Sequence, residues 1–360
     1  MLSSCFPAHL VTTALSSLLS SASTSTSTLT SSPMQLQDGA SSVDLLVLGL
    51  GWTGSFLLPH IRTHHKDLSV AATTRDGRDG TLKWAWDSEQ DGKDQYEALP
   101  RAKTVVVVFP LRGEGYSRRL VEGYEEAVGQ RVRWIQLGST GIFDGGPTLA
   151  SLRASSTDDD TNEKPVSPPE FEWTTRHSPY DRKNARAIAE DELLSLHADT
   201  VVLNLVGLWG GSRNPINWFT RIAPTPEALE AKGSLHLLHG LDLARAIIAV
   251  HLAPSLPTCS SADVEKGTGQ RWIVSDLRVL DWWDLASAHP TGPSAPPPAA
   301  SAAGERSPDR ALWVQDLMRK HGVRALPRTP QELGRAIDAR EFWDAFGLMP
   351  VRGRWEEARA

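Results

Sequence analysis

The stretch over residues 43–54, Val-Asp-Leu-Leu-Val-Leu-Gly-Leu-Gly-Trp-Thr-Gly, most constrains what this chain can fold into. Its apolar first half predicts a buried strand, and its three glycines have the spacing G-x-G-x-x-G. Residues 55–61 then predict the start of a helix, so the motif stands in the strand–turn–helix context that it requires. In that context the glycines permit a tight turn, the approach of a pyrophosphate and close packing of the helix. The predicted dinucleotide-binding residues are Gly49, Gly51, Trp52, Thr53 and Gly54.

Composition narrows the classes of partner. The chain has 360 residues, of which 40% are hydrophobic and 22% are charged, and 43 acids against 37 bases give a net charge of −6. Since nucleic-acid binding needs a basic face, the charge argues against a nucleic-acid or anionic-membrane partner. No apolar run approaches the roughly 18 residues of a membrane span. These observations favour a globular protein that acts on a small molecule.

The first 42 residues are dominated by serine and threonine, and the first lysine or arginine of the chain is Arg62. Such a tract buries too little apolar surface to fold, so we expect a disordered extension over residues 1–42. Targeting peptides carry basic residues, so a cytoplasmic location is expected, with a mitochondrial one as the alternative. The two cysteines, Cys5 and Cys259, predict no disulfide framework and fit a reducing compartment. The histidines show no metal-ligand spacing, so no metal site is predicted.

Three further segments predict strands, over residues 68–75, 104–109 and 132–137, and a helix is predicted over 116–129. Near-continuous β-branched runs, as in 104–109, are typical of parallel strands that are covered on both faces. Repeated alternation of strand and helix predicts an α/β fold, a doubly wound parallel sheet of the Rossmann type. A loop at the end of the third strand, Phe109-Pro110, is expected to pass the cofactor.

The end of the second predicted strand lies about twenty residues beyond the glycine turn, where such folds read the adenosine ribose. The sequence there is Thr74-Arg75-Asp76. A guanidinium pairs with a phosphate through two parallel hydrogen bonds, so Arg75 favours NADP. Thr74, beside it at the strand end, is the other predicted cofactor-binding residue here. Asp76 could instead accept from a ribose hydroxyl, which leaves NAD as the alternative.

The fourth predicted strand runs into Gly-Ser-Thr-Gly at residues 138–141. Ligands of doubly wound sheets bind at the carboxyl ends of the strands. Ser139 or Thr140 is therefore expected to donate a hydrogen bond to a substrate oxygen, although this sequence is also ordinary turn chemistry. Residues 146–177 are polar and predict a surface insertion.

A helix is predicted to begin at Ser178-Pro179, since serine is a good N-cap and proline is favoured in the first turn. In such a helix Tyr180, Lys183 and Asn184 would share one face. A phenol beside a cation can serve as a general acid, because the cation lowers its pKa.

These motifs resemble the short-chain dehydrogenase/reductase superfamily, in its extended or atypical branch of epimerase/dehydratase-like proteins. The likeness spans about residues 43–290, in family order, and includes the turn over 203–211 and the segment over 237–248. It implies an NAD(P)-binding Rossmann domain over 43–215 and a small substrate lobe over 216–360. The lobe would include a sheet strand near 271–275 and a flexible insertion over 289–308.

The resemblance also implies that Ser139 and Tyr180 are catalytic, but the family's Tyr-x-x-x-Lys pattern is not kept. Asn184 stands where the family has lysine, and Lys183 lies one residue away, about 100° around a helix. Asn184 can bind a ribose but cannot lower the pKa of a phenol by charge. Arg186 is another nearby cation, although it lies off the face of Tyr180 in such a helix.

The sequence therefore predicts an NADP-dependent oxidoreductase or epimerase-like enzyme that acts on a polar small molecule. Ser139 or Thr140 would hold the substrate oxygen, Tyr180 would exchange its proton, and Lys183 or Asn184 would orient the ribose. Replacing Tyr180 by phenylalanine is expected to abolish turnover and spare cofactor binding. The alternative is a non-catalytic NAD(P)-sensing protein that regulates a protein partner. A homodimer is a further expectation, since helices that flank such sheets often pair.

Overall fold

The computed structural model describes residues 42–90, 93–144, 171–256, 269–289 and 310–353. All of them belong to one unit, Leu36–Ala360. The predicted extension over 1–42 and the predicted insertion over 289–308 lie outside the described residues except for residues 42 and 289. The predicted insertion over 146–177 is described only over 171–177, where the Thr174 N–H donates to the Ala336 carbonyl at 2.7 Å.

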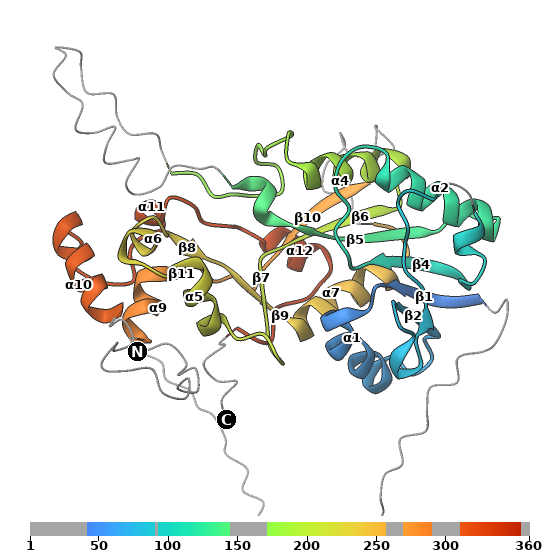
Figure 1. The fold of residues 1–360 in the computed structure, drawn as a ribbon, viewed down its shortest axis with the longest axis horizontal. Coiled ribbons are helices and arrows are strands. Elements are labelled where there is room, and N and C mark those ends of the chain that lie inside the picture. The colour runs from blue at the N-terminus through green and yellow to red at the C-terminus, as the bar shows by residue number, and fades with distance from the viewer. Residues whose placement is uncertain (1–41, 91–92, 145–170, 257–268, 290–309, 354–360) are drawn as a thin grey trace, which may run out of the picture. The chain divides into compact units, whose positions relative to one another are not determined.

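Among the described residues, seven strands form one sheet in the order β10-β6-β5-β4-β1-β2-β3, and all neighbouring pairs are parallel (Figure 1). The strands are β1 Ser42–Leu48, β2 Val70–Thr74, β3 Leu82–Lys83, β4 Arg101–Val107, β5 Arg133–Ser139, β6 Thr200–Leu205 and β10 Gln270–Val274. The chain order reverses between β1 and β4, which is the switch point where such sheets bind ligands. The predicted doubly wound Rossmann sheet is confirmed.

The period-2 alternation of β1 explains why helices cover both faces of the sheet. Leu45 and Val47 point into one core, which α1 Gly51–His64 and α7 Gly240–Leu252 complete. Leu46 and Leu48 point into the opposite core, where helices α2 and α4 pack (Figure 1). These two helices span Tyr116–Val128 and Ala185–Leu196.

Beyond the main sheet, short elements build a third core around tryptophan side chains. Two small sheets pair β7 with β9 in parallel and β8 with β11 antiparallel. The strands are β7 Gly207–Trp209, β8 Ser234–Leu235, β9 Leu237–His239 and β11 Leu280–Asp281, and the helices are α5 Phe219–Ile222, α6 Pro226–Glu230, α9 Trp282–Ala288, α10 Arg310–His321, α11 Pro330–Leu333 and α12 Arg340–Ala345. The 3₁₀ turns are η1 Arg78–Gly80, η2 Asp94–Tyr96, η3 Thr140–Phe143 and η4 Pro215–Trp218. None of the helices in the described part of the chain has the length and apolarity that crossing a membrane requires.

A buried carboxylic acid follows β10. The backbone N–H of Asp276 donates to the Leu237 carbonyl, and its Oδ1 accepts from the Arg278 N–H at 3.1 Å. Its Oδ2 has no hydrogen-bond partner among the described residues. Burial is the main cause that raises the pKa of Asp276 from 3.8 to about 7, and neighbouring Asp242 adds to the increase. Between about pH 4 and about pH 7, the Asp276 carboxyl is therefore protonated in the folded protein and ionised in the unfolded chain.

This proton predicts a pH dependence of stability. Because the folded pKa is the higher one, the free energy of unfolding should fall as pH rises from about 4 to about 7, by on the order of a few kcal/mol. Asp276→Asn keeps the shape and carries no titrating proton, so its stability should depend less on pH over that window. Urea unfolding of both proteins at pH 5 and pH 7.5 checks this. Equal losses of stability in the two proteins would contradict it.

Candidate functional site

The glycine turn between β1 and α1 has the geometry that its sequence predicts. Gly49 has φ +77°, its N–H donates to Thr73 Oγ1 at 2.9 Å, and a Cβ atom there would lie 3.0 Å from the Phe109 ring. Gly51 has φ +45°, and a Cβ atom added there would have no heavy atom within 4 Å. Gly54 is packed against the Leu50 side chain, which lies 2.2 Å from an added Cβ. The backbone of the turn is therefore accessible at Gly51, and at Gly54 the helix packs closely against the Leu50 side chain.

The N-terminus of α1 carries no side-chain cap, and its first turn contains no acid. Several other helices have a side-chain cap, as α4 has Asn184, α7 has His239 and α9 has Asp281, whereas α2, α5 and α12 also lack one. The N–H groups at the start of a helix favour an anion, both as donors and through the helix dipole. The start of α1 therefore fits a bound pyrophosphate in the place of a cap.

A cavity of about 990 Å³ opens at this helix start. It lies at the carboxyl ends of β1, β4, β5 and β6, where the first residues of α1 meet the ends of the other strands. None of its described lining residues is an aspartate or a glutamate. The lining residues from the sheet side are Gly51, Trp52, Thr53, Val108, Pro110, Leu137, Gly138, Ser139, Arg186, Leu205 and Val206, and those from the opposite side are Gly207, Leu208, Arg213, Asn217, Trp218, Arg221, Ile222, Leu235 and Trp282.

The predicted ribose-reading residues stand at the end of β2. Thr74 is buried, and its hydroxyl accepts from the Gly77 N–H at 3.0 Å and contacts the Thr81 hydroxyl at 2.6 Å, so it holds the turn together. A hydrogen bond with Thr74 lowers the pKa of Asp76, which pairs with Arg78 at 3.3 Å. Arg75 is exposed and has no ion-pair partner among the described residues. The guanidinium of Arg75 is therefore available to bind a ligand, whereas the carboxylate of Asp76 is paired with Arg78.

The two residues of the predicted loop Phe109-Pro110 have different surroundings. Pro110 lines the cavity. The Phe109 ring instead packs beside Gly49 and stacks on Trp86, with centroids 5.9 Å apart and planes 22° apart. Phe109 thus supports the glycine turn from its side.

Ser139 and Thr140 separate at the end of β5. Ser139 lines the cavity, and its Oγ accepts from the Gly141 N–H at 3.1 Å as the cap of η3, which leaves its O–H proton free to donate. Thr140 is only 6% exposed, and its hydroxyl already donates to the Leu205 carbonyl at 3.2 Å. Of the two, Ser139 is placed to meet a ligand.

The prediction of a helix from Pro179 is wrong, because α4 begins at Ala185. Two cap signals compete here. Asn184 is the N-cap of α4, because its Oδ1 accepts from the Arg186 N–H at 3.0 Å. The Asp181 N–H instead donates to the Ile142 carbonyl, at 2.9 Å. Tyr180, Lys183 and Asn184 therefore share no helical face, and none of them is among the described residues that line the cavity.

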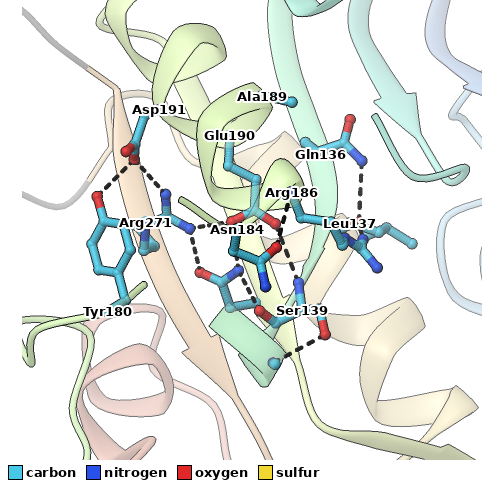
Figure 2. Close-up of polar contacts among 12 residues, drawn as sticks. Gln136, Leu137, Ser139, Tyr180, Asn184, Arg186, Ala189, Glu190, Asp191 and Arg271 are labelled. Atoms are coloured by element: carbon cyan, nitrogen blue, oxygen red, sulfur yellow. Dashed lines mark hydrogen bonds and ion pairs between the residues drawn. The ribbon is translucent and has the colours of Figure 1, made fainter. Parts of the chain in front are cut away.

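Tyr180 takes part in a polar network behind Ser139 (Figure 2). Its hydroxyl donates to Asp191 Oδ1 at 2.7 Å, and its ring lies 4.8 Å from the Arg271 guanidinium. Burial, followed by the bond to Asp191, raises the pKa of Tyr180. Lys183 is exposed to solvent. The structure therefore gives the phenol a structural partner and places no lysine beside it.

Arg271 joins the network to the strand that carries Ser139. Its guanidinium pairs with Glu190, donates to Asn204 Oδ1 at 2.9 Å and donates to Asp191 Oδ1 at 2.8 Å. Glu190 in turn accepts from the Ser139 N–H at 3.3 Å and from Asn204 Nδ2 at 2.8 Å. Since Glu190 is only 3% exposed, this network holds the backbone of Ser139 from the side away from solvent.

Arg186 is the cation that the structure places beside Ser139. It lies in the first turn of α4, lines the cavity and donates to the Leu137 carbonyl at 3.1 Å. Its Nε is buried with no hydrogen-bond partner among the described residues, and burial lowers its pKa. The sequence offers Arg186 as a nearby cation that would lie off the face of Tyr180 in a continuous helix, and that helix does not form.

Sequence reasoning missed the opposite wall of the cavity, to which η4 and α5 contribute. Arg213 stands over the Trp52 ring at 4.3 Å, and Trp52 Nε1 donates to the Gly210 carbonyl at 3.0 Å. The only local signal was the turn over 203–211, which the family resemblance had included for its glycines.

Comparisons with known proteins identify the fold. No family model matches the chain, and no curated protein matches it by sequence. A solved structure described as "putative NAD-dependent epimerase/dehydratase", from Methylobacillus flagellatus, is 14% identical, with a TM-score of 0.52 over 88% of this chain and 96% of that one. A functionally unknown conserved protein from Silicibacter pomeroyi is 13% identical, with a TM-score of 0.50 over the same shares of the two chains.

A third solved structure, a short-chain dehydrogenase/reductase superfamily protein from Agrobacterium tumefaciens with bound NAD, is 12% identical, with a TM-score of 0.49 over 87% of this chain and 95% of that one. At these identities the likeness concerns the fold. Together with the strand order and the glycine turn, the likeness to the first two structures shows that the chain has a Rossmann-type α/β fold.

Proposed function

We propose that the chain is an NADP-dependent oxidoreductase or epimerase-like enzyme of atypical short-chain dehydrogenase type that acts on a polar small molecule. One observation carries this proposal. A single cavity joins the uncapped start of α1 to Ser139 and Arg186 at the carboxyl ends of the strands. A glycine turn suited to a dinucleotide and polar groups suited to a reacting oxygen therefore face the same space.

Each residue has a role that follows from its position. The N–H groups at the start of α1 hold the pyrophosphate, and Arg75 pairs with the 2′-phosphate of the adenosine ribose. The bound nicotinamide supplies the hydride chemistry. Ser139 donates a hydrogen bond from its hydroxyl to the substrate oxygen and keeps its proton, and Arg186 stabilises the negative charge that develops on that oxygen, since a preorganised cation is effective there. The open cavity lets solvent deliver the proton that the oxygen finally keeps.

Titration of the full chain with NADPH and then NADH tests the cofactor assignment. We expect NADPH to bind more tightly, and Arg75→Met to weaken NADPH binding by about tenfold or more, because a charge-assisted pair with the 2′-phosphate is lost. The affinity for NADH should change little in that variant. Calorimetry measures both affinities.

Arg62→Met is the matched control for this titration. Arg62 is also an exposed arginine, but it lies in the last turn of α1, at the opposite end of the helix from the glycine turn. Its substitution should leave both affinities unchanged. Tighter binding of NADH than of NADPH would assign the ribose to Asp76 and favour NAD, and equal NADPH affinity in Arg75→Met would reject the role of Arg75.

A second candidate function is a nucleotide-sensing protein without chemistry, whose bound cofactor controls a protein partner. The position of Tyr180 and Lys183 outside the cavity lining favours it. Such a protein would bind NADPH stoichiometrically, would show no turnover on a panel of carbonyl compounds and would retain a partner only with cofactor present. Turnover on any member of the panel would reject this candidate.

A further inference from the structure

A groove of about 790 Å³ lies along α7, and it shares no lining residue with the cavity at the glycine turn. We call it the α7 groove. Its lining comes from α7, from the last turns of α1 and from the segment 345–351 that ends α12 and follows it. On α7, Leu241, Ile248 and Leu252 lie on one face of the helix, over a length of about 16 Å. The α7 groove is therefore elongated, and its volume is in the range of ligand sites.

Apolar side chains of the α7 groove are left in contact with solvent. Five large hydrophobic side chains are exposed in the described residues. Two of them, Leu252 and Val351, line the α7 groove, and a third, Met349, lies between two lining residues. Covering such surface is favourable, and a contiguous apolar patch with a polar rim is typical of a binding surface.

The polar rim of the α7 groove favours an anion. The His60 ring lies 4.8 Å from the His64 ring and 5.5 Å from the His65 ring, between centroids. Its Nδ1 is buried with no hydrogen-bond partner among the described residues. Burial lowers the pKa of this ring, and repulsion from His64, His65 and Arg245 lowers it further. No aspartate or glutamate is among the described residues that line the α7 groove, so an anion meets only imidazoles and a guanidinium there.

Arg245 is the permanent cation of this rim, and its bonds hold it in place. Its Nη1 donates to Asp242 Oδ1 at 3.0 Å and to the Met349 carbonyl at 2.6 Å. Asp242 also accepts from the N–H groups of Val351 and Arg352, both at 2.9 Å, so the segment 345–351 is fixed against α7. Nε and Nη2 of Arg245 have no hydrogen-bond partner in the described part of the chain. That edge of a guanidinium can bind a carboxylate through two parallel hydrogen bonds.

We propose that the α7 groove binds an unbranched alkyl carboxylate, the chemistry of a fatty acid, with its carboxylate at Arg245 and the histidines of α1 and its chain along α7 toward Leu252. The rim selects an anion because no described lining residue repels it. The elongated apolar face of α7 selects a linear chain over a compact ring. The inference is independent of the proposed function, because the glycine turn lies at the other end of α1.

Calorimetric titration of the full chain with decanoate, kept below the concentration at which it forms micelles, tests the inference. Decanol and acetate are the comparison ligands, since one lacks the charge and the other lacks the chain. We expect one site for decanoate, with an affinity about tenfold or more above that of decanol, and no measurable binding of acetate. Leu252→Glu should weaken decanoate binding by about tenfold or more, because it places a carboxylate where the chain lies.

Leu312→Glu is the matched control. Leu312 is 55% exposed against 50% for Leu252, and it lies in α10, outside the α7 groove. This variant adds the same charge and should bind decanoate as the natural chain does. His64→Glu tests the rim, since His64 is exposed and the new carboxylate should repel the ligand carboxylate. It should weaken decanoate by about tenfold or more and leave decanol within about threefold.

Three results would overturn the inference. The first is absence of decanoate binding, or equal affinities in Leu252→Glu and Leu312→Glu. The second is decanol binding as tight as decanoate, because the carboxylate would then not be recognised. The third is a dimer that dissociates in Leu252→Glu, measured by analytical ultracentrifugation, because a second copy of the chain would then cover the α7 groove.

Discussion

Replacing Arg186 by methionine should lower turnover by about two to three orders of magnitude, the usual effect of removing a group that stabilises developing charge. Arg186 lines the cavity on the same side as Ser139, and its buried Nε has no hydrogen-bond partner among the described residues. The affinity for NADPH should change much less, because the start of α1 does not depend on this side chain. Steady-state kinetics on a substrate found in a carbonyl panel, together with calorimetry, measures the two effects separately.

Two further variants make this test decisive. Arg186→Lys keeps the charge and should recover part of the lost turnover. Tyr180→Phe removes a hydroxyl that already donates to Asp191 outside the cavity lining, so we now expect it to retain most of the turnover. Loss of turnover in Tyr180→Phe with normal turnover in Arg186→Met would return the catalytic role to Tyr180, as the sequence alone predicts.

The largest effect on stability is expected for Arg271→Met, with a loss of about 3–5 kcal/mol in the free energy of unfolding. Arg271 is 7% exposed and is the cation that neutralises buried Glu190. Without it the hydrogen bonds that the carboxylate keeps among the described residues come from neutral donors, Asn204 and the Ser139 N–H, and the carboxylate stays desolvated. Urea unfolding of the variant measures the loss.

The double variant Arg271→Met/Glu190→Gln separates the charge from the packing. Removing the stranded carboxylate should restore part of the stability, because a neutral amide is easier to bury than an unpaired charge. Arg324→Met should change the free energy of unfolding by less than about 0.5 kcal/mol, as is usual for exposed side chains. A loss below about 1 kcal/mol in Arg271→Met would show that water reaches Glu190 and that the network does not hold Ser139 rigidly.

The sheet could be predicted because its signals are local. The β-branched run over 104–109 predicts a buried parallel strand. The glycines of the turn predict the positive φ angles that the structure has there. The place of Ser139 at the end of a strand could be predicted for the same reason, because a strand followed by turn residues is a local pattern. These features depend on neighbours within a few positions, which a single sequence contains.

The start of α4 could not be predicted in this way. Ser178-Pro179 and Asn184 are both good beginnings for a helix, and they differ little in local preference. The choice is accompanied by a bond from the Asp181 N–H to the Ile142 carbonyl, on a segment 39 positions earlier in the chain. That contact belongs to the folded protein, and it moves Tyr180 and Lys183 off the helical face on which they were expected.

The sequence by itself determined the Rossmann sheet and the glycine turn, because periodicity and glycine content are properties of contiguous residues. Only the tertiary structure decided which cations line the cavity. Arg186, Arg213 and Arg221 meet at one cavity, and the bond from Trp52 to Gly210 that closes its edge spans 158 positions. Such a meeting depends on how the chain beyond the sheet packs back over the strand ends, and no local pattern of charge or spacing encodes it.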